Sequence, residues 1–274
     1  MSNSTTTATA TATRPDRQAD ISISGLSKSY GLPGHDVLTI GDVTLDIASG
    51  EFVAVVGASG CGKSILLRIV AGFEKPSGGT VLVGRNPVTG PGPDRGVVFQ
   101  DYGLFPWLTV RENVASGPRQ HGSRRRAARA TVDHFLALVG LVRSAGKFPG
   151  QLSGGMQQRV AIARVLANDP AVLLMDEPCG ALDAPTRTDL QTELRRIHRA
   201  NAVTVLFVTH SIEEAVYLAD RVVVKTGGAA HDVPGHIRQV VPVNLGENPD
   251  PSSREFNTVK RMIADLVHDG SDHV

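Results

Sequence analysis

The sequence has little cysteine and no long apolar run. Its two cysteines, Cys61 and Cys179, provide no disulfide framework, and they form no metal-spaced set with the nine histidines, so we expect a reducing compartment. No apolar stretch approaches the roughly 18–20 residues that span a bilayer. We therefore expect any role at a membrane to come through a partner protein. The first residues also lack the apolar core of a secretory signal.

The charges are nearly balanced. Twenty-eight basic and 27 acidic residues give a formal net charge of +1, so no basic excess points to nucleic acid and no acidic excess points to a cationic partner. A local group of arginines at 124–126 and 129 is expected to be a solvated helix face. Apolar residues make up 41% of the chain, which suits one globular unit with a sizeable core.

Composition separates a tail from the folded part. Residues 1–19 are rich in Ser, Thr and Ala and have almost no large apolar side chain, so we predict a disordered tail. An organellar transit peptide is the alternative, and Asp16, Asp20 and the scarcity of arginine count against it. Residues 20–245 show alternating strand and helix patterns. Residues 246–274 have room for a short C-terminal extension with one helix, at about 256–266.

Strand and helix patterns alternate on both sides of a helical stretch at about 101–160. Short apolar runs predict strands at 21–26, 43–47, 52–56, 81–83, 96–99, 171–175, 203–208 and 221–224. Helical spacing and stop signals predict helices at 65–70, 128–139, from 154 to before Pro170, around 190–197, and after a capping box formed by Ser211 and Glu214. This order predicts a mostly parallel sheet interrupted by a helical lobe.

Residues 57–64, Gly-Ala-Ser-Gly-Cys-Gly-Lys-Ser, match the phosphate-loop pattern G-x-x-x-x-G-K-[ST]. The match follows a buried strand and opens a helix, which is the context that the motif requires. Backbone N–H groups and the helix N-terminus attract phosphate oxygens, Lys63 reaches the β- and γ-phosphates, and Ser64 ligates Mg²⁺. A simple glycine-rich turn is the alternative.

Two carboxylates, Asp176 and Glu177, follow the apolar run 172–175. In ATPases with this loop, one such acid holds Mg²⁺ and a neighbouring one can orient and deprotonate the attacking water. Asp176 suits the first role and Glu177 the second. Acids that merely end a strand are the alternative.

Residues 152–159, Leu-Ser-Gly-Gly-Met-Gln-Gln-Arg, resemble the signature motif of ABC ATPases. The phosphate loop, Gln100, the acid pair, the segment 181–183 and His210 occur in the order of that family, with Tyr30 upstream. The resemblance covers about 21–245. It implies an α/β fold, namely a P-loop NTPase of the ABC ATPase type, with a mostly parallel core sheet, an antiparallel β region and the inserted helical lobe.

The resemblance also implies ATP and Mg²⁺ as cofactors and assigns roles by position. Catalytic roles are implied for Glu177, His210, Gln100 and Lys63, and Mg²⁺ binding for Ser64, Gln100 and Asp176. Nucleotide contacts are implied for Tyr30, Gly57, Ala58, Ser59, Gly60, Cys61, Gly62, Lys63, Ser64, Ile65, Ser153, Gly154, Gly155 and Asp183.

Some of these roles keep alternatives or depart from the family. Ser153, Gly154 and Gly155 would act on ATP bound by a partner's phosphate loop, which implies a head-to-tail homodimer. Tyr30 can stack on adenine or be a packing aromatic, and His210 can be a helix-cap neighbour without a ligand. Ile65 replaces a threonine often found there, which removes a possible α-phosphate contact.

The function implied is the ATPase subunit that energises an ABC importer at the cytoplasmic face of the inner membrane. It would bind permease subunits, work indirectly with a solute-binding protein, and bind no nucleic acid. Taken alone, the segment 102–110 could simply be core of the helical lobe, whereas in the family it lines the groove for a membrane subunit. This segment and the ending 234–243 resemble importers of nitrate, sulfonate and taurine, so small anionic or zwitterionic solutes are expected. A soluble ABC ATPase of a non-transport assembly, such as iron–sulfur cluster building, is the alternative. A GTPase or a small-molecule kinase would not explain the signature motif.

Cys61 lies inside the phosphate loop, two residues before Lys63. Loop N–H groups, the helix dipole and the lysine favour a thiolate, which predicts labelling by a maleimide and protection by MgATP. An inert small residue, chosen because the loop is tight, is the alternative.

Overall fold

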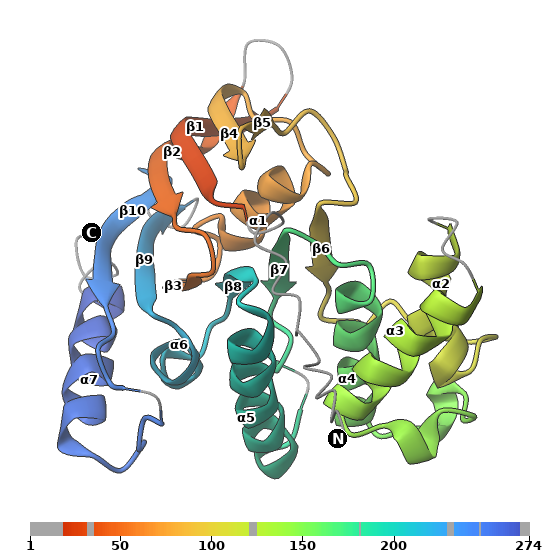
Figure 1. Cartoon of the computed structure of the whole chain (residues 1–274). Helices are drawn as coiled ribbons and strands as arrows, with labels where there is room; N and C mark the ends of the chain where they lie inside the picture. Colours follow the sequence, from red (N-terminus) through yellow and green to blue (C-terminus); the bar gives the residue numbers. More distant parts are fainter. Residues whose placement is uncertain are drawn as a thin grey trace, which may run out of the picture.

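A computed structural model describes residues 19–31, 36–120, 125–180, 182–228, 233–246 and 248–268. The predicted tail lies outside these residues except for residue 19, and so does Ala181 of the segment 181–183. One ten-stranded sheet runs through the molecule in the order β5-β4-β1-β2-β10-β9-β3-β8-β7-β6 (Figure 1). In the described part of the chain, every helix is too short or too polar to cross a bilayer.

Antiparallel strands form one end of the sheet. β1 (Ile21–Tyr30) pairs with β2 (Val37–Ile47) on one side and with β4 (Gly78–Val83) on the other, and β4 pairs with the short β5 (Asn86–Pro87). Burial alternates along β2, where Val43, Leu45 and Ile47 are buried and the residues between them are exposed. The alternation is that of a strand with one face on the core.

Parallel strands form the other end. β3 (Phe52–Gly57) lies between β8 (Thr204–Val208) and β9 (Arg221–Gly228), and β7 (Val172–Asp176) lies between β8 and β6 (Arg95–Val98). β10 (Val233–Pro242) runs antiparallel to β9 and meets β2 at one bridge, between Gly235 and Ile40.

The described part of the chain has seven α-helices: α1 (Lys63–Ala71), α2 (Val110–Gln120), α3 (Arg125–Leu138), α4 (Gly154–Leu166), α5 (Ala184–Asn201), α6 (Ile212–Leu218) and α7 (Arg254–His268). Helices α2, α3 and α4 all come between β6 and β7 in the chain. They lie together beside β6, the edge strand of the sheet, in Figure 1. Two 3₁₀ turns, Val142–Ser144 and Pro149–Gln151, connect α3 to α4.

Two buried apolar clusters lie against the two faces of the central strands. Val53 and Val55 of β3 belong to the cluster that contains α1 and the antiparallel strands, whereas Ala54 and Val56 belong to the cluster that contains α4, α5 and α6. Because both faces of β3 are covered, its sequence is a continuous apolar run. Burying each valine or leucine fully contributes about 1.5–3 kcal/mol, so these two clusters are the main source of stability.

The predicted fold class is confirmed, and so is each strand and helix that the sequence patterns indicate. Only one of the two hydrogen bonds of the predicted capping box at α6 is present. Ser211 is the N-cap, and its Oγ accepts a hydrogen bond from the Glu214 N–H. However, the Ser211 N–H donates to the Thr209 hydroxyl, not to the Glu214 carboxylate, because that carboxylate is already bound to the Thr209 hydroxyl.

Candidate nucleotide site

The sequence motifs meet at one edge of the parallel strands. The phosphate loop follows β3, Gln100 follows β6, Asp176 and Glu177 end β7, and His210 follows β8. Parallel strands end on the same side, so these four segments lie along the carboxyl edge of the sheet, where α/β proteins bind ligands.

The phosphate loop depends on glycines that have no room for a Cβ atom. A Cβ on Gly57 (φ +154°) would lie 2.1 Å from the Lys225 carbonyl oxygen, and one on Gly62 (φ +83°) would lie 2.7 Å from Ile40 Cγ1. The Lys63 Nζ donates hydrogen bonds to the carbonyl oxygens of Gly57 at 2.8 Å and Ala58 at 3.0 Å. The loop therefore holds the lysine over itself, where anionic phosphates can draw the ammonium away from the two carbonyls.

Ser64 and Asp176 meet across the sheet edge. The Ser64 hydroxyl donates to Asp176 Oδ1 at 3.0 Å. Burial raises the pKa of Asp176, whereas the hydrogen bond from Ser64 lowers it. A hydroxyl and a carboxylate at this separation form the oxygen-only donor set that suits Mg²⁺, and a divalent cation would compensate the desolvation of the carboxylate. The residues present therefore fit the metal that the family implies.

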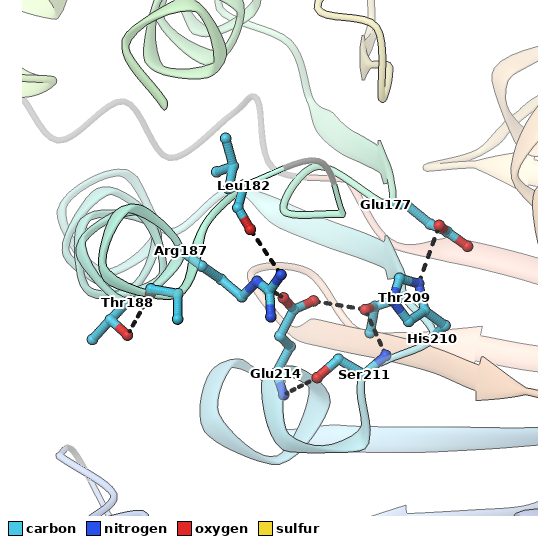
Figure 2. Close-up of polar contacts among 9 residues, drawn as sticks. Glu177, Leu182, Arg187, Thr188, Thr209, His210, Ser211 and Glu214 are labelled. Carbon is cyan, nitrogen blue, oxygen red and sulfur yellow. Dashed lines mark hydrogen bonds and ion pairs between the residues drawn. The ribbon is translucent and has the colours of Figure 1, made fainter. Parts of the chain in front are cut away.

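Glu177 and His210 face one another, as Figure 2 shows. His210 Nδ1 lies 3.2 Å from Glu177 Oε2, and the side chain of His210 is largely exposed. Glu177 has a φ of +47°, an uncommon conformation for a residue with a side chain, and its N–H donates to the Val208 carbonyl at 2.9 Å. Gln100 borders the same place, because a Cβ on Gly180 would lie 3.5 Å from Gln100 Nε2 and 3.7 Å from Glu177 Oε2.

A buried polar network lies behind His210 (Figure 2). The Thr209 hydroxyl donates to Glu214 Oε2 at 2.6 Å, and both residues are buried. Arg187 Nε lies 3.6 Å from Glu214 Oε1, and Arg187 Nη2 donates to the Leu182 carbonyl at 2.8 Å. This network joins the segment that carries His210 to the segment that carries Asp183.

Tyr30 lies at the end of β1 and is 42% exposed. Its hydroxyl donates to the Glu74 carboxylate, and the Lys28 ammonium lies 4.7 Å from the centre of its ring. Burial and the bond to Glu74 raise the pKa of Tyr30 to about 12. The ring is thus held in place by charged neighbours, which is compatible with stacking on a base.

Ser153, Gly154 and Gly155 open α4, and Asp183 precedes α5. The Ser153 hydroxyl is exposed and accepts a bond from the Met156 N–H at 3.4 Å. Gly155 has no room for a side chain, because a Cβ there would lie 2.0 Å from Thr186 Cγ2 of α5. α4 packs in one buried cluster and α1 in the other, so the signature segment and the phosphate loop of this chain begin helices on opposite faces of the sheet.

The structure contradicts the hypothesis of an accessible thiolate at Cys61. The side chain is fully buried, with its Sγ 3.0 Å from the position that a Cβ on Gly57 would take. Cys179 is fully buried as well, and burial raises the pKa of its thiol. Packing beneath the loop therefore favours the alternative for Cys61, an inert small residue.

Sequence reasoning missed three groups near the site. Glu74 anchors Tyr30, Glu214 and Arg187 form the network behind His210, and Lys225 lies buried on β9. The sequence did contain a signal for Lys225, a single lysine that follows three valines, because lysine is rarely buried in a strand without a partner. The pairings of Glu74 and Glu214 left no pattern in the sequence.

Comparison with known proteins gives the class of this protein. Residues 40–180 match the ABC transporter family. A solved structure of the ATP-binding cassette MJ0796, a dimer bound to ADP and phosphate, superposes with a TM-score of 0.68 at 30% identity and covers 82% of this chain and 99% of its own. The chain belongs to the ABC transporter family and is an ATP-binding ATPase.

The relatives narrow this class to import subunits. A protein of Brucella abortus (strain 2308) described as ATP-binding is 52% identical over 254 residues, 90% of this chain and 93% of its own. The nitrate import ATP-binding protein NrtD of Synechococcus elongatus is 50% identical and covers 75% of this chain and 76% of its own. The taurine import ATP-binding protein TauB of Roseobacter denitrificans is 49% identical, with 74% and 76% coverage. The expected resemblance to this importer group is confirmed.

Proposed function

We propose that this chain hydrolyses ATP as a head-to-tail homodimer bound to permease subunits, at the cytoplasmic face of the inner membrane, and so drives import of a small anionic or zwitterionic solute. The observation that carries the transport role is Trp107, which is 70% exposed and lies beside Phe105, with 5.6 Å between the ring centres. An exposed pair of large aromatic side chains is a typical protein-docking feature.

Arg164 connects this docking segment to the signature helix. Its guanidinium donates to the carbonyl oxygens of Gly103 at 2.5 Å and Tyr102 at 3.2 Å and lies 5.4 Å from the Phe105 ring centre. Arg164 belongs to α4, the helix that begins after Ser153. A permease that moves Trp107 would therefore shift the segment that is to contact the partner's ATP.

The roles of the site residues follow from their positions. Lys63 and the loop N–H groups would hold the β- and γ-phosphates, and Ser64, Asp176 and Gln100 would hold Mg²⁺, which supplies charge neutralisation on the phosphate oxygens. Glu177 would take the proton of the attacking water. His210 would orient Glu177 and contact the γ-phosphate. Ser153, Gly154 and Gly155 of one protomer would complete the site of the other, with Asp183 at the seam and Tyr30 on the adenine.

Reconstitution with a permease tests the transport role. We expect the ATPase rate of the chain to respond to its cognate permease and to the loaded solute-binding protein, and Trp107→Ala to weaken the association with the permease while basal hydrolysis persists. Val142→Ala, another exposed apolar residue of the same lobe, is the matched control. Stable binding to a soluble assembly with no permease would favour the iron–sulfur type of alternative.

The solute is tested on the solute-binding protein, because the ATPase subunit does not contact it. Nitrate, taurine and other small anions or zwitterions should be compared in a binding titration. Binding only of large apolar or cationic solutes would contradict the proposed class, yet would leave the ATPase assignment intact.

A further inference from the structure

Lys225 is a buried lysine that the roles above do not use. It follows Val222, Val223 and Val224 on β9 and is 0% exposed, and its Nζ has no hydrogen-bond partner among the described residues. A buried ammonium without a partner is costly unless an anion compensates it or it gives up its proton. A nearby anion would therefore stabilise the charged form of Lys225.

The register of β9 directs the Lys225 side chain to the face that α1 covers. Val55 and Val223 are paired and belong to the apolar cluster with α1, whereas Val56 and Val224 belong to the opposite cluster. Side chains alternate along a strand, so Lys225 lies on the same face as Val223. Its backbone partner is Gly57, the first residue of the phosphate loop.

The charged and titratable groups that act on Lys225 belong to this loop. Burial lowers the pKa of Lys225 to about 8, while Cys61 raises it and Lys63 lowers it. Cys61 is packed beside Gly57, and Lys63 opens α1. Lys225 thus lies against the phosphate loop.

We propose that Lys225 is a second cation of the nucleotide site, which acts on the phosphate chain from beneath the loop and takes up a proton when nucleotide binds. The inference rests on nucleotide binding by the phosphate loop and not on what the assembly transports. An anionic phosphate chain favours the charged lysine, so the pKa in the complex exceeds the pKa in the free protein. Affinity is then full below the free pKa and falls as the pH rises toward the pKa of the complex.

Calorimetric titration with ADP and Mg²⁺ at pH 8, in HEPES and in Tris, measures the proton directly, because the two buffers differ in ionisation enthalpy. We expect net uptake of a fraction of a proton by the unmodified chain and an affinity that falls about three- to tenfold from pH 7 to pH 9. The nucleotide contributes little, because the last phosphate ionisation lies at a pKa of about 6.

Three variants identify the group responsible. Lys225→Met should abolish the uptake, flatten the pH profile and bind about three- to tenfold more weakly at pH 7. Lys260→Met, at a half-buried lysine of α7 that pairs with Glu213, is the control and should behave like the unmodified chain. Cys61→Ser should still take up the proton, because the lysine and not the thiol is the group proposed.

Two results would overturn the proposal. One is the absence of proton uptake by the unmodified chain at pH 8, a measurement that needs no variant to fold. The other is uptake by Lys225→Met equal to that of the unmodified chain. Loss of uptake in Cys61→Ser with retention in Lys225→Met would assign the proton to the thiol. None of these measurements involves a permease, so they fail or succeed separately from the proposed transport role.

Discussion

His210 Nδ1 and Glu177 Oε2 lie 3.2 Å apart, although the two residues follow different strands, β8 and β7. The contact brings an imidazole ring to a carboxylate of the acid pair, beside the phosphate loop. It occupies one carboxylate oxygen of Glu177, and the proposed action on water would fall to the other. The side chain of His210 is largely exposed.

Glu177→Gln removes the carboxylate proposed as the base and keeps the size of the side chain. We expect ATP binding to be retained and hydrolysis to slow by about 10²–10⁴-fold. ATP should also hold the variant as a dimer, which size-exclusion chromatography with and without ATP would detect. Near-normal turnover in this variant would show that Glu177 is not the base.

Ser153→Arg tests the shared site. The exposed Ser153 hydroxyl lies at the start of α4, so an arginine there should block the partner's ATP without disturbing the chain's own phosphate loop. Hydrolysis should be lost while nucleotide binding by the monomer remains. Binding of a fluorescent ATP analogue and steady-state ATPase assays measure the two effects.

A mixture of chains provides the control for that experiment. Lys63→Ala alone should impair phosphate binding, and a heterodimer of Lys63→Ala with Ser153→Arg should contain one intact site. Partial recovery of activity is therefore expected. If heterodimers form and show no recovery at all, the head-to-tail arrangement is wrong.

Thr209→Val tests the network behind His210. The substitution leaves the buried Glu214 carboxylate and the Ser211 N–H without the hydroxyl that now serves both. We expect the free energy of unfolding to drop by about 1–3 kcal/mol, measured by urea titration. Thr209→Ser keeps the hydroxyl and should recover most of the stability. Equal loss in both variants would mean that the methyl group matters and the hydrogen bonds do not.

The sequence patterns predicted the elements better than the connections between side chains. The apolar run 52–56 and the eight-residue phosphate loop placed Lys63 and Ser64 correctly, because local patterning and a fixed spacing determine both. The bond of Glu214 to Thr209 could not be predicted, because Glu214 had two partners within reach and packing selected the hydroxyl. Lys225 depends on the pairing of β9 with β3, which only the folded chain specifies.

The two cysteines should be unreactive in the native protein. Cys61 and Cys179 are both fully buried, so a maleimide can reach them only when the structure opens. We expect slow labelling in buffer and rapid labelling of both thiols in concentrated urea, followed by mass spectrometry of the peptides. The labelled peptide that disappears in Cys61→Ser is the one that carries Cys61. Rapid native labelling of Cys61 that MgATP suppresses would restore the thiolate hypothesis.

The strand that leads into the phosphate loop has both of its neighbours late in the chain. β3 lies between β8 and β9. Gly57 packs against Lys225 of β9, and Gly62 packs against Ile40 of β2. Ile40 in turn bridges to Gly235 of β10. During synthesis, the loop residues therefore emerge long before β8 and β9, the two strands that flank β3. A ribosome-bound chain that ends before β9 should carry every phosphate-contacting residue of the loop and still fail to hold nucleotide. Until then its unpaired central strand offers two open edges to chaperones or to other nascent chains.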